Sequence, residues 1–316
     1  MSSPEVVSSA EIRPADDLSR EVRRFPAPGA VLTLLKPVTW FPPMWAFLCG
    51  VTSSGASFSG KGWTLAGGIL LCGPLVCASS QAVNDWYDRH VDAINEPGRP
   101  IPSGRIPGRW GLAIAIVWSL LALSWSSVFG TLGMIATGFA LALAWGYSMP
   151  PFRFKQNGWV GNAAVGLAYE GLAWLTGIVV FTDRMPTAAQ WWCIGLYSLA
   201  GHGILTLNDF KAIEGDRQMG VNSLPVLHGA VPAARIASSI MLVSQLGVMA
   251  LLFAWGMWGY ALVLLALILV QARMMHRFIA SPVEKALWLS AAGVPLEVLG
   301  MLVAALALRA SPLLHG

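Results

Sequence analysis

Apolar residues gather in nine long runs along the chain, and short turns or polar loops separate them. The hydrocarbon core of a bilayer, about 30 Å thick, is crossed by about 20 predominantly apolar helical residues. The runs have about this length, although Pro42 and Pro43 interrupt the first. The pattern predicts an all-α integral membrane protein with nine transmembrane helices, over residues 38–58, 63–84, 111–129, 131–149, 160–181, 189–208, 231–254, 256–275 and 286–308.

Composition agrees with a membrane protein and excludes other classes. Of the 316 residues, 55% are hydrophobic and 11% are Asp, Glu, Lys or Arg, whereas soluble domains carry about 25% charged residues. Because so few charges cannot cover a water-facing surface, we exclude soluble, disordered and nucleic-acid-binding proteins. The cysteines stand in apolar runs without metal-ligand spacing, so we interpret them as small buried side chains: Cys49, Cys72, Cys77 and Cys193.

The Lys and Arg residues predict an orientation in the membrane. With nine helices and a cytoplasmic N-terminus, 17 of the 20 fall on the cytoplasmic side, and only Lys61, Arg184 and Arg309 fall on the other. Cytoplasmic loops of membrane proteins carry such an excess. We therefore predict a cytoplasmic N-terminus, with residues 1–35 as a flexible tail that includes a short surface helix over 16–25. The membrane domain is predicted over 36–316.

Acidic residues concentrate in two short segments, each at the predicted cytoplasmic end of an even-numbered helix. Residues 84–92 read NDWYDRHVD and residues 208–216 read NDFKAIEGD, so the Asn-Asp pair and the final Asp align. This repeat, four predicted helices apart, suggests two related halves around one cytoplasm-facing active chamber. The acidic residues of the segments are Asp85, Asp88, Asp92 and Glu96, then Asp209, Glu214 and Asp216.

The spacing of the first segment favours a metal site. On a helix, positions i, i+3 and i+7 lie within about a 60° arc, so Asp85, Asp88 and Asp92 can point the same way. Asp209 and Asp216 can do so if their helix continues. Converging carboxylates without His or Cys suit Mg²⁺, which keeps open positions for phosphate oxygens. Basic residues nearby are of the type that holds a diphosphate: Arg89, Lys155, Lys211 and Arg217.

Three other interpretations compete with a metal-dependent enzyme. A solvated acidic loop with ordinary surface pairing explains one segment, but it explains two matching segments poorly. In a divalent-cation transporter, the carboxylates would sit near the membrane midplane on interrupted helices, whereas these stand at helix ends. A pigment-binding antenna or assembly protein would account for the 15 Trp residues, but not for the paired Asp motifs.

The first motif resembles the Asn-Asp-x-x-Asp-x-x-x-Asp signature of the UbiA superfamily of intramembrane prenyltransferases. Longer runs are similar to the chlorophyll and bacteriochlorophyll synthase branch, most of all to the bacteriochlorophyll enzymes. They read LKPVTWFPPMWAFLCG, NDWYDRHVDAINEPGRPIPSGRIPGRWG, NGWVGNAAVGLAYEG and LNDFKAIEGDRQMGVNSLPV. The resemblance extends from about Leu35 to Pro225 and continues more weakly to the C-terminus.

The resemblance implies a reaction. Such enzymes esterify the propionate of bacteriochlorophyllide or chlorophyllide with geranylgeranyl or phytyl diphosphate, and they release diphosphate. It also implies a bacterial inner, photosynthetic membrane, with pigment-biosynthesis or photosynthetic assembly proteins as partners. Quinone or haem prenyltransferases of the same superfamily remain the alternative. The acceptor carboxyl, with a pKa of about 4–5 by analogy with side chains, is ionised at neutral pH, so no general base is required.

Residue roles follow from the matched motifs. Asn84 and the three aspartates after it match the first Mg-diphosphate motif, Asp216 matches the last carboxylate of the second, and Lys155 matches a basic diphosphate contact. One position departs from the pattern, because Ala212 replaces the usual acid four residues before Asp216, and Asp209 is expected to take its role.

Three polar residues stand within predicted helices and require an explanation. Glu170 is expected either to line the chamber or to pack between helices. His202 is interpreted as a ligand to the chlorin magnesium or as an ordinary interhelical histidine. Glu297 is expected to form a packing hydrogen bond.

Overall fold

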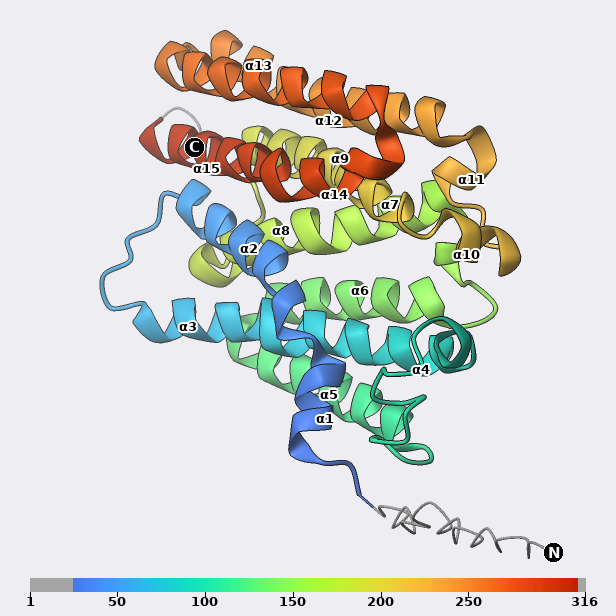
Figure 1. The fold of residues 1–316 in the computed structure, drawn as a ribbon. Coiled ribbons are helices and arrows are strands. Elements are labelled where there is room, and N and C mark those ends of the chain that lie inside the picture. Colours follow the sequence, from blue (N-terminus) through green and yellow to red (C-terminus); the bar gives the residue numbers. More distant parts are fainter. Residues whose placement is uncertain (1–24, 312–316) are drawn as a thin grey trace, which may run out of the picture.

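The computed structural model describes residues 25–311, and its named elements in that range are all helical (Figure 1). Helices α3–α6 form one side of the bundle and α12–α15 the other, with α2, α7, α8 and α9 between them (Figure 1). The α-helices are α1 (Pro28–Leu35), α2 (Phe41–Ser53), α3 (Gly62–Leu70), α4 (Ala78–Asn95), α5 (Trp110–Ser126), α6 (Gly130–Ser148), α7 (Gly158–Gly166), α8 (Ala173–Thr182), α9 (Ala188–Asp209), α10 (Ile213–Gln218), α11 (Leu224–His228), α12 (Ala230–Ala254), α13 (Trp258–Ala280), α14 (Pro282–Ala292) and α15 (Val294–Ala310).

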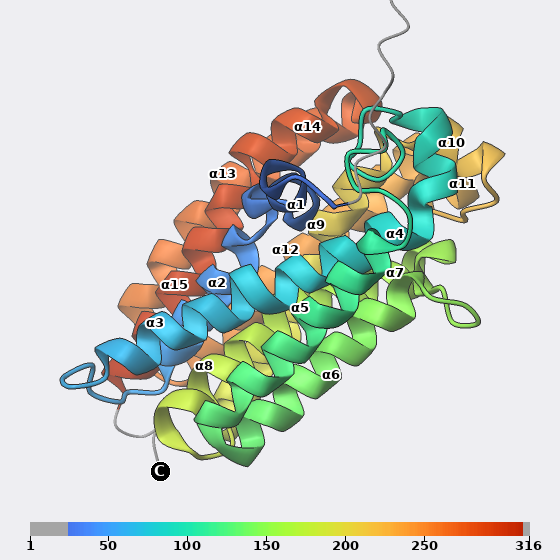
Figure 2. The ribbon, with the colours of Figure 1, turned by 90° about the horizontal axis from the view of Figure 1, so that it is seen from below.

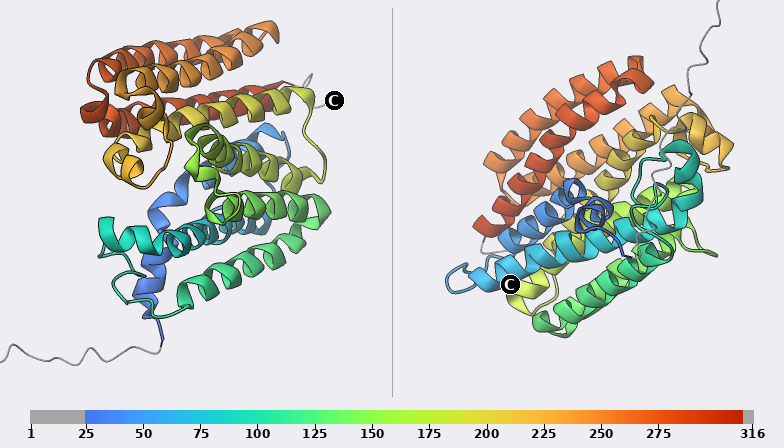
Figure 3. Two further views of the ribbon diagram at one scale, coloured as in Figure 1. Left: turned by 90° about the vertical axis from the view of Figure 1, so that its right-hand side faces the viewer. Right: turned by 60° about the horizontal axis from the view of Figure 1, so that its bottom comes forward.

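Six helical stretches within residues 25–311 are long and apolar enough to cross a bilayer, so the chain is an integral membrane protein. One of them contains two antiparallel helices, because α5 and α6 fold back at Gly130, where φ is +76°, and lie side by side (Figures 2 and 3). The six are Gly62–Asn95, Trp110–Ser148, Gly158–Thr182, Ala230–Ala254, Trp258–Ala280 and Pro282–Ala310.

Two predicted spans are not among these stretches. The span at 38–58 contains only α2, whose 13 residues fall short of a membrane's thickness. The span at 189–208 corresponds to α9, whose 22 residues include polar side chains such as His202, Thr206 and Asn208. A total of nine spans, and their orientation, therefore stay a prediction.

Part of the predicted flexible tail is helical. Residues 28–35 form α1, whose Ala30, Leu34 and Leu35 are buried in a cluster with α4 and α5. The apolar side chains of this segment gain a packing surface, and that contact accounts for its order. The short surface helix predicted over 16–25 lies almost entirely outside the described residues.

Two π-helical segments interrupt long helical stretches of the bundle. Segment η2 (Leu71–Cys77) joins α3 to α4, and η5 (Leu167–Leu172) joins α7 to α8. Pro74 lies in η2, and its carbonyl oxygen accepts a hydrogen bond from the Trp118 indole at 3.0 Å. Proline is tolerated in a membrane helix where neighbouring groups satisfy the backbone in this way. Such π-bulges are frequent at functional sites.

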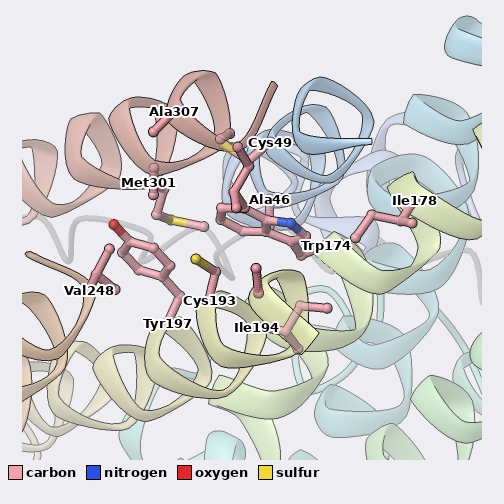
Figure 4. Close-up of a cluster of buried hydrophobic side chains, with 14 of the residues drawn as sticks. Ala46, Cys49, Trp174, Ile178, Cys193, Ile194, Tyr197, Val248, Met301 and Ala307 are labelled. Carbon is pink, nitrogen blue, oxygen red and sulfur yellow. The ribbon is translucent and has the colours of Figure 1, made fainter. Parts of the chain in front are cut away.

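The largest core cluster joins α2, α8, α9, α12, α13 and α15. Figure 4 shows Trp174 of α8 beside Cys193 and Tyr197 of α9, with Met301 of α15 close by. Trp174 and Tyr197 stack with ring centroids 5.5 Å apart. All four cysteines are free and buried, which confirms their interpretation as small core side chains.

Buried polar groups in the carboxy-terminal half are joined to one another. The Gln271 amide donates to the Glu297 carboxylate at 3.1 Å, and Gln245 donates to Gln271. The predicted packing hydrogen bond of Glu297 is thus confirmed. Because an isolated polar group is costly in lipid, this chain of side chains ties α12, α13 and α15 together.

Candidate active site

A cavity of about 320 Å³ runs along the inner faces of α4, α6, α7–α8 and α9. On α4, α9 and α6, the lining residues nearest the two Asp motifs are Asn84, Asn208 and Tyr147. The far end is formed by apolar and small side chains such as Leu71 and Ala136. The cavity therefore has a polar mouth, defined here by Asn84, Asn208 and Tyr147, and a hydrocarbon interior.

Helical geometry spreads the first motif over one arc. Relative to Asn84, Asp88 is turned by about 40° around the helix, Asp92 by about 80° and Asp85 by about 100°. Asn84 lines the cavity and donates to Asp88 at 2.9 Å. Asp85 and Asp92, which are 1% and 6% exposed, are instead enclosed by basic side chains. Only the Asn84–Asp88 pair thus stands at the mouth.

Two cations neutralise the buried carboxylates. Lys36 Nζ lies 2.6 Å from Asp85 Oδ1, and Arg99 Nη1 lies 3.3 Å from the same oxygen and 2.9 Å from Asp92 Oδ2. Arg99 also pairs with Glu96 at 2.6 Å, and this hydrogen bond lowers the pKa of Glu96. Asp85 and Asp88 both lie within electrostatic range of Asp92, so the three carboxylates are neighbours, and their common role as metal ligands stays a prediction.

Lys155 brings a positive charge to the mouth. It follows α6 in a short 3-10 turn, η4 (Phe154–Gln156), and it forms an ion pair with Asp88. Burial lowers the pKa of the Lys155 ammonium, and the Asp88 carboxylate acts in the opposite direction. A desolvated ammonium beside a single carboxylate is well suited to bind a further anion, which supports the predicted diphosphate contact.

The second motif does not lie on one continuous helix. α9 ends at Asp209 and α10 begins at Ile213, so the predicted common helix face for Asp209 and Asp216 is wrong. Asp209 accepts a hydrogen bond from Asn162 of α7 at 3.1 Å. Asp216 lies on α10, where burial raises its pKa.

The two motifs nevertheless meet across the cavity. Tyr147 lies within electrostatic range of Asp88, Asp209 and Asp216, and it lines the mouth itself. The turn after α9 replaces helix continuity, because it carries Asp216 back toward Asp209. Carboxylates from both halves of the chain are thus gathered around one opening.

Several predicted site residues lie elsewhere. The Arg89 guanidinium lies 4.1 Å from the Trp86 ring centroid and donates to the Trp86 carbonyl, so it is engaged by its own helix. Arg217 pairs with Glu214 at 3.1 Å, and both side chains are more than half exposed. Lys211 is exposed and lies close enough to Glu96 to act on it electrostatically.

The two candidate intramembrane residues are also outside the cavity lining. Glu170 is directed toward α9, since its Cγ lies 3.1 Å from the position of a Cβ built on Gly201. His202 is 5% exposed and packs against Trp159, with ring centroids 5.5 Å apart. The arrangement favours interhelical packing for both residues.

Sequence reasoning missed residues that the fold brings to the site. Lys36 and Arg99 carried a signal, because each stands beside proline in a polar break near the first motif. Tyr147 and Asn162 lie in apolar helices, and nothing in their spacing distinguishes them from packing residues. Tyr169 and Gln81 in the cavity wall were missed for the same reason.

The donor set fits a magnesium ion that is shared with a substrate. Within residues 25–311, no three Asp, Glu, His or Cys side chains come close enough together to hold a metal by themselves. Mg²⁺ is usually bound through one or two carboxylates together with substrate phosphates. Asp88, Asp209 and Asp216, with the amides of Asn84 and Asn208, offer hard oxygen donors of this kind around the mouth.

Comparisons with known proteins agree with this site. The sequence pattern of the UbiA prenyltransferase family matches residues 37–308. The bacteriochlorophyll synthase 33 kDa chain of Cereibacter sphaeroides is 49% identical over 93% of this chain and 97% of its own length. Chloroplastic chlorophyll synthase of Oryza sativa is 41% identical over 87% of this chain and 76% of its own length.

Solved structures show the same fold. A UbiA homologue from Archaeoglobus fulgidus, bound to GPP and Mg²⁺, superimposes with a TM-score of 0.68 at 19% identity. The match covers 86% of this chain and 99% of that one. With the family pattern spanning almost the whole described bundle, the chain belongs to the UbiA prenyltransferase family and is an integral-membrane prenyltransferase.

Proposed function

We propose that the protein esterifies the propionate of bacteriochlorophyllide or chlorophyllide with a C20 prenyl diphosphate and releases diphosphate. The observation that carries this proposal is a cavity with carboxylates and Lys155 near its mouth and mainly apolar walls beyond. That shape matches a ligand with a charged head and an apolar tail. The choice of acceptor is supported by relatives named bacteriochlorophyll synthase and chlorophyll synthase.

In this reaction the bond between the prenyl C1 and the diphosphate oxygen breaks, and its electron pair leaves with diphosphate. A propionate oxygen supplies the electron pair of the new C–O bond. Lys155 stabilises the charge that develops on the leaving group. The apolar walls keep water from the allylic centre, and the acceptor needs no base because its carboxyl is already ionised.

Mg²⁺ is the proposed cofactor. Asp88, Asp209 and Asp216 would hold it, with Asn84 and Asn208 beside them. When bound, the ion neutralises the diphosphate and so makes it a better leaving group. Asp85 and Asp92 are neutralised by Lys36 and Arg99. The carboxylates at the mouth are therefore the ones available to bind the metal.

The proposed setting is a bacterial inner membrane that holds photosynthetic pigments. Nine spans with a cytoplasmic N-terminus are proposed, because this arrangement places the excess of Lys and Arg on the cytoplasmic side. Both Asp motifs would then face the cytoplasm.

The test is an esterification assay with membranes that contain the expressed chain. Geranylgeranyl diphosphate would be supplied with bacteriochlorophyllide, chlorophyllide or an aromatic quinone precursor, with and without EDTA. We expect esterified tetrapyrrole, loss of product with EDTA and recovery with Mg²⁺. Prenylation of the quinone precursor alone would replace this function with another one of the same family.

A further inference from the structure

Polar side chains interrupt the hydrocarbon wall of the cavity well inside its mouth. Gln81 Nε2 donates to the Tyr169 hydroxyl at 2.9 Å. Ser80 Oγ lies 3.3 Å from the same hydroxyl, and the Cys77 thiol donates to it at 3.4 Å. Thr39 Oγ1 lies 3.6 Å from Cys77 Sγ. We call these five residues the wall cluster; all of them line the cavity.

The wall cluster is assembled by the irregular parts of the fold. Tyr169 belongs to η5 and Cys77 to η2, the two π-helical segments. Gln81 follows one turn after Cys77 on α4. The Tyr169 hydroxyl, on the helical stretch α7–α8, thus contacts side chains of the stretch α3–α4 and links these two walls of the cavity.

A prenyl chain cannot use these groups. Beyond its diphosphate, a C20 isoprenoid has only carbon and hydrogen, and it offers no partner to a hydroxyl or an amide. The groups of the wall cluster bond to one another, so a polar ligand can bind there by exchanging these hydrogen bonds for its own, whereas a hydrocarbon chain cannot. The wall cluster is therefore better matched to a second ligand with polar atoms of its own.

The size of the cavity limits what that ligand can insert. At about 320 Å³, the cavity is at the lower end of the roughly 300–1,000 Å³ typical of small-molecule sites. A C20 chain and a whole tetrapyrrole do not fit together in this volume, so only an edge of the macrocycle enters. Thr39 lies in η1 (Pro37–Thr39), where the neighbouring Val38 is 88% exposed. The wall cluster thus lies directly behind a surface that a membrane-dissolved pigment can approach.

We propose that the wall cluster is the acceptor subsite, and that Tyr169 and Gln81 bind the carbonyl-bearing edge of the tetrapyrrole. The Tyr169 hydroxyl accepts from Gln81 and donates toward Ser80 Oγ, because the Ser80 hydroxyl donates its own hydrogen to the Cys77 carbonyl oxygen at 2.7 Å. A carbonyl oxygen of the ligand would take the Tyr169 hydrogen in place of Ser80. Tyr169 and Gln81 are positioning residues, since they hold the acceptor while its propionate reaches the prenyl C1. This inference rests on the proposed function and assigns its acceptor site.

The test compares Tyr169→Phe and Gln81→Leu with a matched control, Tyr197→Phe. Tyr197 is a buried tyrosine of α9 that does not line the cavity. Initial rates would be measured at varied tetrapyrrole and at varied prenyl diphosphate. We expect the KM for the tetrapyrrole to rise about five- to tenfold in each wall variant, as for one lost hydrogen bond. The KM for prenyl diphosphate and both constants of the control should stay within about twofold.

A binding measurement separates this inference from the proposed function. Bacteriochlorophyllide would be titrated without prenyl diphosphate, and the shift of its long-wavelength absorption band recorded. Weaker binding by both wall variants supports the subsite whatever the turnover. Unchanged binding, or an equal rise in KM for both substrates, overturns it and makes the wall cluster a structural crosslink. If Tyr169→Phe does not fold, Thr39→Val and Gln81→Leu decide the question. Loss of ester formation by the wild type would count against the proposed function alone.

Discussion

At the scale of single residues, the charges near the first motif have different tasks although they share one helix. Asp85 and Asp92 are enclosed with Lys36 and Arg99, whereas Asp88 stands at the mouth with Asn84 and Lys155. All three carboxylates are ion-paired, but the Asp88 side chain is more exposed than those of Asp85 and Asp92. Asp88 can therefore meet a ligand more readily than the two carboxylates that are enclosed with their cations.

Asp88 should therefore be the most sensitive carboxylate of the first motif. We expect Asp88→Asn to lower kcat by about 100-fold or more, as for loss of a group that stabilises developing charge. Glu284→Gln, on the exposed start of α14, is the matched control and should be silent. Rates of purified, monodisperse variants at limiting and saturating Mg²⁺ would measure this. Wild-type rates for Asp88→Asn at limiting Mg²⁺ would refute the role.

The second motif offers a sharper comparison between two acids two residues apart. Asp216 lies within electrostatic range of Tyr147 and Asp209, whereas Glu214 pairs with Arg217 in solvent. We expect Asp216→Asn to reduce turnover by about 100-fold and Glu214→Gln by less than about twofold, because exposed ion pairs contribute little. Initial rates decide the order. Equal losses in the two variants would mean that α10 turns toward the mouth when substrate binds.

At the scale of elements, glycines set how closely the central helices approach. Gly50 of α2 and Gly177 of α8 face each other, and a Cβ on Gly50 would lie 2.1 Å from the Trp174 carbonyl oxygen. Small residues let membrane helices pack backbone to backbone. This contact fixes α8, and through it η5 and the wall of the cavity.

Gly50→Ala should separate α2 from α8, because the clashing atom belongs to the backbone and cannot rotate away. We expect a fall in the unfolding temperature in detergent of several degrees, together with lower activity. Gly195→Ala on α9 is the control, since its added methyl meets no atom within 4 Å; alanine should be neutral or slightly stabilising there. Light-scattering or fluorescence melts would test the pair. Equal melting of Gly50→Ala and the wild type would show that the helices can shift without loss.

At the scale of the whole molecule, both Asp motifs lie at one end of the bundle. The loop with Lys61 precedes α3 and lies at the opposite end of the helical stretch α3–α4. The excess of Lys and Arg near the motifs predicts that this end faces the cytoplasm. The charged diphosphate head group would then meet the site at the cytoplasmic membrane surface.

Labelling should reveal this orientation. In a variant without reactive native cysteines, we expect Arg105→Cys to be labelled by an impermeant maleimide only in inside-out vesicles, and Lys61→Cys only in right-side-out vesicles. Arg105 precedes α5, and Lys61 precedes α3. Labelling of both positions from one side would contradict a cytoplasmic mouth. Labelling in detergent would verify that each cysteine is reactive.

The sequence by itself determined the class of the protein and the chemical character of its site. Long apolar runs specify helices in a membrane because every backbone group must be satisfied within its own segment there. The two aligned segments, 84–92 and 208–216, indicated where the candidate site lies, because carboxylates at the ends of apolar helices require a function.

Only the tertiary structure decided how those residues are used. The periodicity of a sequence shows how side chains are distributed around one helix. It does not show which side chains of other segments face them. Lys36 pairs with Asp85 from 49 residues earlier in the chain, and Arg99 pairs with Asp92 from the loop after α4. A turn after α9 replaces the helix expected between Asp209 and Asp216. The hydrogen bond between Gln81 and Tyr169 depends on the two π-helical segments, because Tyr169 lies in η5 and Gln81 follows η2 by one turn. Contacts between segments far apart in the chain depend on packing, and local sequence pattern carries no record of them.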